Sequence, residues 1–151
     1  MNVPTEQAIL SELGTIPDPE IPVLTLVEMK IIRSVTVVGE EVQVVISPTF
    51  IGCPALDYMK EEIRSRLANI GCRQVKIEMT FSPPWSTDLL EPGTLEKLRV
   101  YGIAPPPKLG IDLPVTLAIP VPCPACGSTD TRMQSPFGAT LCKQMYTCGN
   151  C

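Results

Sequence analysis

The stretch IGCPALDYMKEEIRSRLANIG, residues 51–71, decides the fold of the N-terminal part of the chain. Apolar side chains recur in it at steps of three and four residues, and charged side chains occupy the other faces. The apolar positions are Leu56, Met59, Ile63, Leu67 and Ile70. This pattern predicts an amphipathic helix that packs on a core and ends at Gly71.

Two segments with the two-residue periodicity of strands flank this helix. Before it, residues 35–46 alternate around Gly39-Glu40, which predicts a β-hairpin with a two-residue turn. After it, residues 75–81 alternate apolar and polar side chains, as a strand buried on one face does. A strand, a helix and a further strand predict a right-handed crossover that places the last strand in the sheet of the hairpin.

The remaining N-terminal elements are two short helices. One is predicted from about Thr5, its N-cap, to Leu13, and the other from about Thr94 to Tyr101, where Gly102 stops it. The predicted fold class is α+β: a small mixed three-stranded sheet packed by helices, followed by a C-terminal four-cysteine zinc ribbon.

The expected domains follow from composition. Residues 1–104 form the α+β domain, residues 105–122 form a proline-rich linker, and residues 123–151 form the finger.

Composition limits the chemistry and the partners. The chain has 151 residues, with seven cysteines and no histidine, which excludes Ser-His-Asp catalysis, Cys-His catalysis and histidine-ligated metals. A net charge of −4 without a basic stripe argues against a nucleic-acid partner. The sequence contains no signal peptide or apolar stretch long enough to span a membrane, and the odd cysteine count suits a reducing cytoplasm.

Four cysteines near the C-terminus form two Cys-x-x-Cys pairs: Cys123 with Cys126, and Cys148 with Cys151. Each two-residue gap allows one tight turn to present two thiolates, so the pairs predict a tetrahedral, structural zinc site. Iron binding, or plain thiols and disulfides, are the alternatives. Cys142 lies between the pairs and is either a small apolar residue or an alternative ligand.

Cys53 is the other cysteine that suggests function. Because Pro54 suits the first position of a helix, Cys53 is the predicted N-cap, where backbone amides and the helix dipole would lower the pKa of its thiol. The alternative is an inert buried thiol, which is the interpretation we favour for Cys72. Asp18 and Glu20, in a proline-rich loop, are either acid–base groups, or else caps or solvated surface residues.

Three motifs in this order resemble the α+β domain of iron–sulfur cluster assembly factors. They are Asp18-Pro19-Glu20, Gly52-Cys53-Pro54 and Pro83-Pro84-Trp85-Ser86. With the linker and the finger, including Cys123-Pro124-Ala125-Cys126 and residues 137–143, the whole chain resembles the D-subunit family of bacterial phenylacetyl-CoA epoxidase (ring 1,2-monooxygenase) systems. Members of that family usually continue past the last cysteine pair with an aromatic-containing tail.

The resemblance implies a non-catalytic accessory subunit in aerobic phenylacetate degradation. Its role would be to assemble or deliver an iron–sulfur cluster or an iron centre, with the reductase and oxygenase subunits as partners. The family's cysteine corresponds to Cys53, with Asp18 and Glu20 as helpers. One protomer offers too few ligands for a stable cluster, so a transient cluster would need a homodimer, the target protein or a small thiol.

Two other functions remain open from the sequence. The chain could be an adaptor that binds a protein through its zinc finger. It could also be a thiol-dependent enzyme with Cys53 as nucleophile, although a carboxylate would then have to act as its base.

Overall fold

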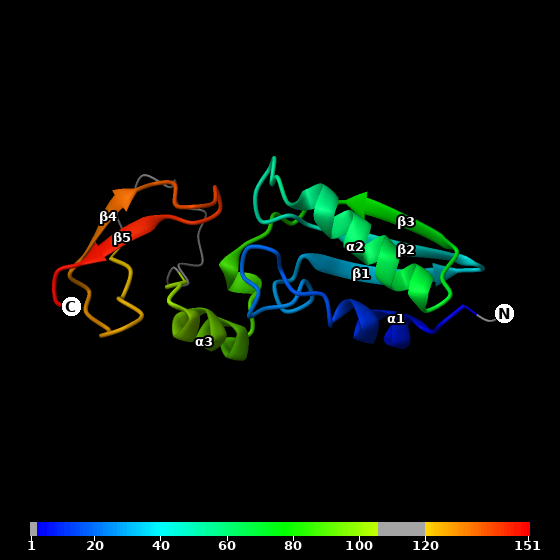
Figure 1. Ribbon diagram of the computed structural model, residues 1–151, viewed down its shortest axis with the longest axis horizontal. Coiled ribbons are helices and arrows are strands. Elements are labelled where there is room, and N and C mark those ends of the chain that lie inside the picture. The colour runs from blue at the N-terminus through cyan, green and yellow to red at the C-terminus, as the bar shows by residue number, and fades with distance from the viewer. Residues whose placement is uncertain (1–2, 106–119) are drawn as a thin grey trace. The chain divides into compact units, whose positions relative to one another are not determined.

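The computed structural model describes residues 3–105 and 120–151, and the chain divides into two compact units, residues 1–89 and 90–151 (Figure 1). The first unit consists of two helices and one three-stranded sheet. In chain order its elements are α1 (Glu6–Leu13), β1 (Ile32–Val38), β2 (Glu41–Ile46), α2 (Leu56–Asn69), β3 (Gln74–Met79) and a 3₁₀ turn, η1 (Thr87–Leu89). The predicted α+β class is therefore confirmed.

The sheet has the order β1-β2-β3 and is mixed, as predicted. The strands β1 and β2 are antiparallel around a turn in which Gly39 has a φ of 64°, a value that favours glycine. The strands β2 and β3 are parallel, which is the pairing that the crossover through α2 requires.

The core lies between the central strand and the two helices. Val42, Val44 and Ile46 are fully buried at alternate positions of β2. The buried faces of α1, with Ile9 and Leu13, and of α2, with Met59, Ile63 and Leu67, contribute to the same core. The Oγ1 atom of Thr5 accepts a hydrogen bond from the Ala8 N–H at 3.2 Å, which confirms the predicted N-cap of α1.

Strand direction brings three loops to one end of this sheet. Because β1 runs opposite to β2 and β3, the loop before β1 and the loops after β2 and β3 all lie at that end (Figure 1). Each loop carries one of the three sequence motifs, so the topology gathers them.

The second unit contains α3 (Pro92–Tyr101), β4 (Thr131–Ser135) and β5 (Met145–Cys148), and the two strands pair antiparallel. Gly102 ends α3 in the left-handed conformation, with a φ of 95°. Most of the predicted linker, residues 106–119, lies outside the described residues. The helix α3 groups with the second unit, which begins at Leu90. The domain boundary at residue 104 stays a prediction.

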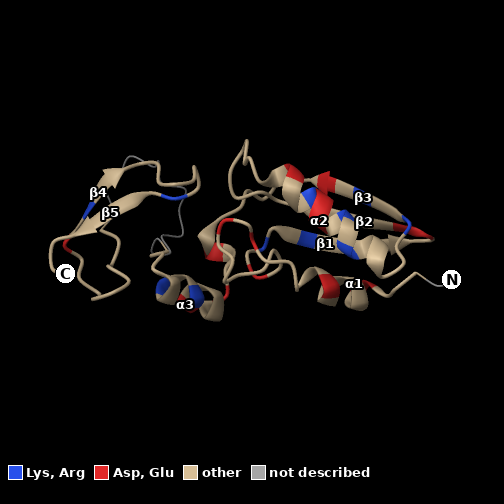
Figure 2. Cartoon of the chain, in the orientation of Figure 1, with Lys and Arg blue, Asp and Glu red and all other residues tan. Residues whose placement is uncertain are grey.

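Charged residues of both signs are intermingled along α2 (Figure 2). Arg66 pairs with Glu62 at 2.9 Å and with Glu12 of α1 at 3.6 Å, which ties the two helices together. Among the described helices, none combines the length and the apolar character that crossing a membrane requires.

Candidate functional site

The first motif loop is shaped by a buried carboxylate. Asp18 is 4% exposed, and its Oδ1 atom accepts hydrogen bonds from the N–H groups of Glu20 and Ile21 at 2.9 and 2.8 Å. The Asp18 N–H donates to the carbonyl of Leu24 at 2.8 Å. Asp18 therefore caps the loop, which was one of the roles open to it from the sequence.

The third motif loop is tied to the segment that leads into β1. The Nε1–H group of Trp85 donates to the Met29 carbonyl at 2.6 Å. The Nη2 atom of Arg33 donates to the Pro83 carbonyl at 3.2 Å and to the Ser47 Oγ atom, at the end of β2, at 3.4 Å. Arg33 was missed from the sequence, because nothing in its local pattern marks a contact fifty residues away.

Cys53 lies in a turn before α2 and does not cap the helix. The N-cap is Ala55, in a helical conformation, and α2 begins at Leu56. The predicted N-cap role of Cys53 is therefore wrong: the chain first makes a turn in which the Leu56 N–H bonds to the Cys53 carbonyl at 3.2 Å. Gly52 enters this turn with a φ of 86°, which a β-carbon would strain.

The predicted direction of the Cys53 pKa is also wrong. Partial burial raises the pKa of the Cys53 thiol, and the negative charges of Glu20 and Asp18 raise it further. The N–H groups of Ala55 and Leu56 bond to the thiol and oppose this rise without overcoming it. At neutral pH the thiol is therefore protonated and lies in an acidic environment.

The structure thus brings Cys53 within electrostatic range of both predicted helpers, Asp18 and Glu20. In the described part of the chain, these three do not form a group whose ligand atoms are close enough to hold an ion by themselves. Cys72 is 2% exposed, and burial raises the pKa of its thiol, as expected of a core cysteine.

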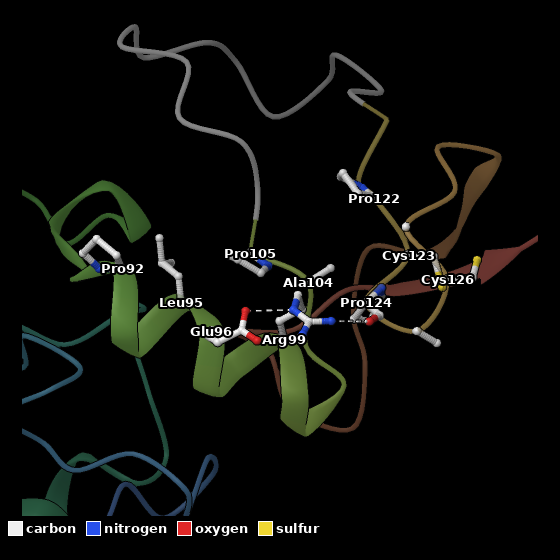
Figure 3. A pocket seen from close by; sticks show the side chains of 12 residues that line it. Pro92, Leu95, Glu96, Arg99, Ala104, Pro105, Pro122, Cys123, Pro124 and Cys126 are labelled. Atoms are coloured by element: carbon white, nitrogen blue, oxygen red, sulfur yellow. Dashed lines mark hydrogen bonds and ion pairs between the residues drawn. The ribbon is translucent and has the colours of Figure 1, made fainter.

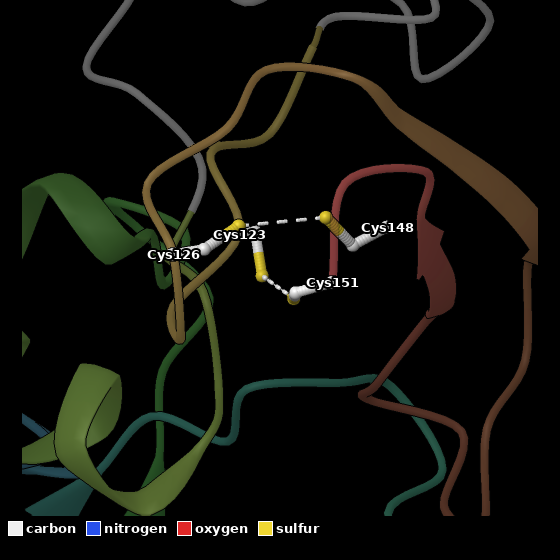
Figure 4. A group of neighbouring side chains, drawn as sticks. All are labelled: Cys123, Cys126, Cys148 and Cys151. Atoms are coloured by element: carbon white, nitrogen blue, oxygen red, sulfur yellow. Dashed lines mark hydrogen bonds between the residues drawn. The ribbon is translucent and has the colours of Figure 1, made fainter.

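The four C-terminal cysteines do form such a group. Their Sγ atoms all lie within 4.8 Å of one another, with Cys123 and Cys151 at 3.7 Å and Cys126 and Cys148 at 3.6 Å (Figure 4). An ion bound tetrahedrally at about 2.3 Å from each sulfur would hold neighbouring sulfurs about 3.8 Å apart. The cluster therefore has the donor set and the dimensions of a tetrathiolate metal site.

Hydrogen-bond donors around this cluster favour the thiolate form of Cys123 and Cys126. Backbone N–H groups of Cys126 and Ala125 lower the pKa of Cys123. The Ser128 N–H, followed by the side-chain amide of Asn150, lowers the pKa of Cys126 to about 6. Cys151 donates to the neighbouring sulfurs, which raises its own pKa to about 12, so a metal ion must displace that proton.

Two residues of the ribbon, Cys142 and Asn150, differ from what the sequence predicted. Cys142 is exposed, contacts Thr140 Oγ1 at 3.3 Å and is not a member of the four-thiol group. Asn150, whose Nδ2 atom lies 3.7 Å from Cys126 Sγ, was missed from the sequence. Asn150 lies between Cys148 and Cys151, and this position could have indicated that its side chain lies near the cysteine cluster.

A pocket of about 560 Å³ lies within the second unit, beside the first cysteine pair (Figure 3). Its walls are α3, Ala104-Pro105 and residues 122–127. Arg99 donates from Nη1 to the Pro124 carbonyl at 3.1 Å and pairs with Glu96 through its other nitrogens at 2.6 and 2.8 Å. The guanidinium thus attaches the Cys-x-x-Cys turn to α3.

Two family profiles match the chain. Iron–sulfur cluster assembly protein matches residues 6–79, and PaaD zinc beta ribbon domain matches residues 115–151. The fold and the cysteine cluster therefore define a protein with an iron–sulfur cluster assembly domain and a C-terminal zinc-ribbon domain.

A comparison over nearly the whole chain gives the family. The D subunit of the "Putative 1,2-phenylacetyl-CoA epoxidase" of Escherichia coli (strain K12) is 39% identical over 148 residues, which are 98% of this chain and 88% of the relative. The chain belongs to the family of this epoxidase component. An "Fe-S protein maturation auxiliary factor" of Porphyromonas gingivalis (strain ATCC BAA-308 / W83) is 36% identical over 88 residues, or 57% of this chain and 83% of the relative.

Solved structures share the fold. A domain of unknown function from Bacillus anthracis has a TM-score of 0.55 at 21% identity and covers 59% of this chain and 86% of its own. A conserved hypothetical protein from Thermotoga maritima has a TM-score of 0.56 at 25% identity and covers 65% of this chain and 98% of its own.

Proposed function

We propose that the chain is an accessory, non-catalytic component of a phenylacetyl-CoA epoxidase system that assembles or delivers an iron–sulfur cluster or iron centre. The observation that carries this proposal is the setting of Cys53, at the end of the sheet where the three motif loops meet. Two backbone N–H groups bond to its sulfur, and Asp18 and Glu20 supply negative charge nearby. Negative charge attracts iron, and the amide donors stabilise the thiolate that forms when iron displaces the proton.

In this proposal the iron or cluster is carried and passed on, because the Cys53 site has too few ligands to retain it. A cluster normally takes four protein ligands, while the described groups that act on the Cys53 sulfur add two carboxylates, Asp18 and Glu20, to its one thiol. The missing ligands would come from the receiving reductase or oxygenase subunit, a small thiol or a second protomer. Incomplete ligation makes the cargo easy to transfer, as delivery requires.

The resident metal in this proposal is zinc, bound by Cys123, Cys126, Cys148 and Cys151. Four thiolates complete a tetrahedral shell and leave no open position, which favours a structural role over a catalytic one. Among residues 120–151 no side chain is fully buried, so the ribbon has little apolar core of its own. Structural zinc contributes roughly 10–16 kcal/mol in small domains, enough to fold such a segment.

Anaerobic reconstitution with iron and sulfide tests the cargo proposal. The full-length protein should take up a sub-stoichiometric cluster, seen by its visible absorption, and transfer it to an apo-reductase or apo-oxygenase subunit. Cys53→Ala should abolish uptake, whereas Cys142→Ser, a matched change at another accessible cysteine, should not. Cys148→Ser should also retain uptake. A tight cluster that survives Cys53→Ala and depends on Cys148 would contradict the proposal.

An adaptor function is the second candidate. The observation that favours it is a set of exposed apolar side chains in the ribbon: Met133, Phe137, Leu141 and Met145. An adaptor would bind the partner subunits with unchanged affinity after Cys53→Ala and would transfer no cluster. A nucleophilic enzyme is disfavoured, because the raised pKa leaves the Cys53 thiol protonated at neutral pH.

A further inference from the structure

One edge of the three-stranded sheet is partly covered and the other is open. At the β1 edge, the Glu6 side chain of α1 accepts the Val37 N–H at 2.9 Å, and the β1–β2 register shifts between Ile32 and Ser34. At the other edge, β3 contacts β2 and α2 among the described elements and has no further strand beside it (Figure 1). An uncovered edge strand presents unpaired N–H and C=O groups and is a template for another strand.

The direction of these groups can be assigned residue by residue. The Thr80 N–H donates to the Ile46 carbonyl at 2.9 Å, so the backbone of Thr80 faces β2. Because successive residues of a strand alternate, Lys76 and Glu78 face β2 as well. The N–H and C=O groups of Val75, Ile77 and Met79 therefore point to the open edge.

We propose that this edge pairs with the β3 strand of a second copy of the chain, antiparallel and centred on Ile77. In this register Ile77 lies opposite Ile77 of the partner subunit, and Val75 lies opposite the partner's Met79. These are the hydrogen-bonded pairs, because their backbone groups point outward. The resulting interface is a two-fold, self-complementary one, and it joins two three-stranded sheets into one of six strands.

Charge selects this register. Lys76 lies opposite the partner's Glu78, and Glu78 lies opposite the partner's Lys76, at non-hydrogen-bonded positions where cross-strand side chains approach most closely. A shift that centres the pairing on Lys76 opposes two lysines, and one centred on Glu78 opposes two glutamates. Within one chain, Lys76 and Glu78 already pair at 2.7 Å and are 53% and 50% exposed, so the edge is locally neutral and accessible.

The same charge pattern argues for a second copy over an unrelated strand. A lone lysine on an edge strand opposes pairing and is a common device against association. Here the lysine is followed two residues later by a glutamate, and this spacing neutralises it when the strand meets itself in antiparallel orientation. A partner strand of another protein would need its own matching Glu and Lys.

The arrangement has a consequence for the cysteine site. Antiparallel β3 strands place the two Cys53 loops at opposite ends of the joined strands, because each loop lies at the C-terminal end of its own β3. The two Cys53 thiols therefore do not share a cluster in this dimer. The inference is independent of the proposed function, and it leaves each Cys53 end open to a separate target.

A six-residue strand buries less surface than stable dimers do, so we expect weak association, in the micromolar range and dependent on concentration. Sedimentation velocity of the full-length, metal-loaded protein over a range of micromolar concentrations measures it. Lys76→Glu or Glu78→Lys alone should weaken the dimer about tenfold or more, because the two-fold symmetry creates two like-charge pairs. The double variant, Lys76→Glu with Glu78→Lys, should restore association to within about threefold of the wild type.

Arg132→Glu, a charge reversal on the ribbon strand β4, is the matched control and should leave association unchanged. Circular dichroism and thermal melting of each variant verify that the α+β unit stays folded. A monomer at every concentration, a dimer that single reversals do not weaken, or a double variant that does not recover would each overturn the proposal.

Discussion

Cys53 and Cys123 begin the same three-residue sequence, Cys-Pro-Ala, in two parts of the molecule that are built differently. In both turns the backbone N–H groups two and three residues after the cysteine bond to its sulfur. The pKa shifts are nevertheless opposite: the pKa of Cys123 is lowered and that of Cys53 is raised. The turn supplies the donors, and the surroundings decide which state of the thiol prevails.

The surroundings differ in desolvation and in neighbours. Both cysteines are half-buried, but desolvation is the largest effect on the pKa of Cys53, which lies in the turn before α2 beside two carboxylates. Desolvation is a smaller effect on the pKa of Cys123, which lies in the ribbon among three other cysteines. The first setting fits the proposed role of a thiol that binds iron and gives it up, and the second fits the proposed role of four thiolates that retain one ion.

The largest expected effect is loss of the ribbon fold on metal removal. Residues 120–151 have no fully buried side chain. Chelation of the metal or Cys126→Ser should therefore unfold the β4–β5 hairpin, while the Cys53 turn keeps its structure. NMR amide spectra and metal analysis measure this, with Cys142→Ser as the control that keeps the metal. A ribbon that stays folded without metal would contradict the prediction that the Cys123 turn depends on a bound ion and the Cys53 turn does not.

The reverse perturbation should leave the ribbon intact. Ile63 is fully buried on α2, so Ile63→Ala should reduce the free energy of unfolding of the first unit by about 2–5 kcal/mol. Denaturant unfolding measures the loss, and metal content should remain at the wild-type value. The exposed Ser65→Ala on the same helix should change stability little. Loss of metal from the Ile63 variant would show that the ribbon depends on the first unit.

Periodicity was enough to predict most of the fold. The apolar steps of α2 and the alternation of β2 report burial directly, so the mixed sheet and its crossover followed from local pattern. The alternation of residues 75–81 predicted the strand β3 correctly, but its predicted buried face is wrong, because no side chain of β3 is buried and Met79 and Phe81 are exposed. The four-thiol group was predicted in the same way, because the spacing of each cysteine pair is itself the geometry of the turn.

The chemistry of Cys53 could not be predicted by the same means. Pro54 indicated a helix start, but one extra turn before Leu56 removes the thiol from the N-cap. The sign of its pKa shift depends on burial and on the approach of Glu20 and Asp18, which only the tertiary fold brings together. The contact of Arg33 with Pro83 is equally non-local.

A smaller effect is expected from the side chain that supports Cys126. Asn150→Ala removes an amide donor and should raise the pKa of the Cys126 thiol from about 6. Protons then compete better for the sulfur at a given pH, so metal should be released at a higher pH during acid titration, and affinity should fall roughly 10–100-fold. Competition with a chromophoric chelator measures it. Thr140→Ala, which contacts the non-ligand Cys142, is the control and should behave as the wild type.

The smallest effect is expected from the carboxylates near Cys53. Glu20→Gln removes the larger of the two negative-charge effects on Cys53 and should lower the pKa of its thiol, while the effect of burial remains. A thiol with a lower pKa is deprotonated at a lower pH, so the midpoint of the alkylation rate of Cys53 against pH should move downward. Glu12→Gln, on α1 beside Arg66, is the matched control and should leave the midpoint unchanged. Asp18→Asn is a poorer test, because the Asp18 carboxylate also caps its loop. If the Glu20 variant titrates like the wild type, the charge of Glu20 does not act on the Cys53 thiol. Glu20 would then have no electrostatic part in binding iron there, and the difference between the two Cys-Pro-Ala turns would rest mainly on desolvation.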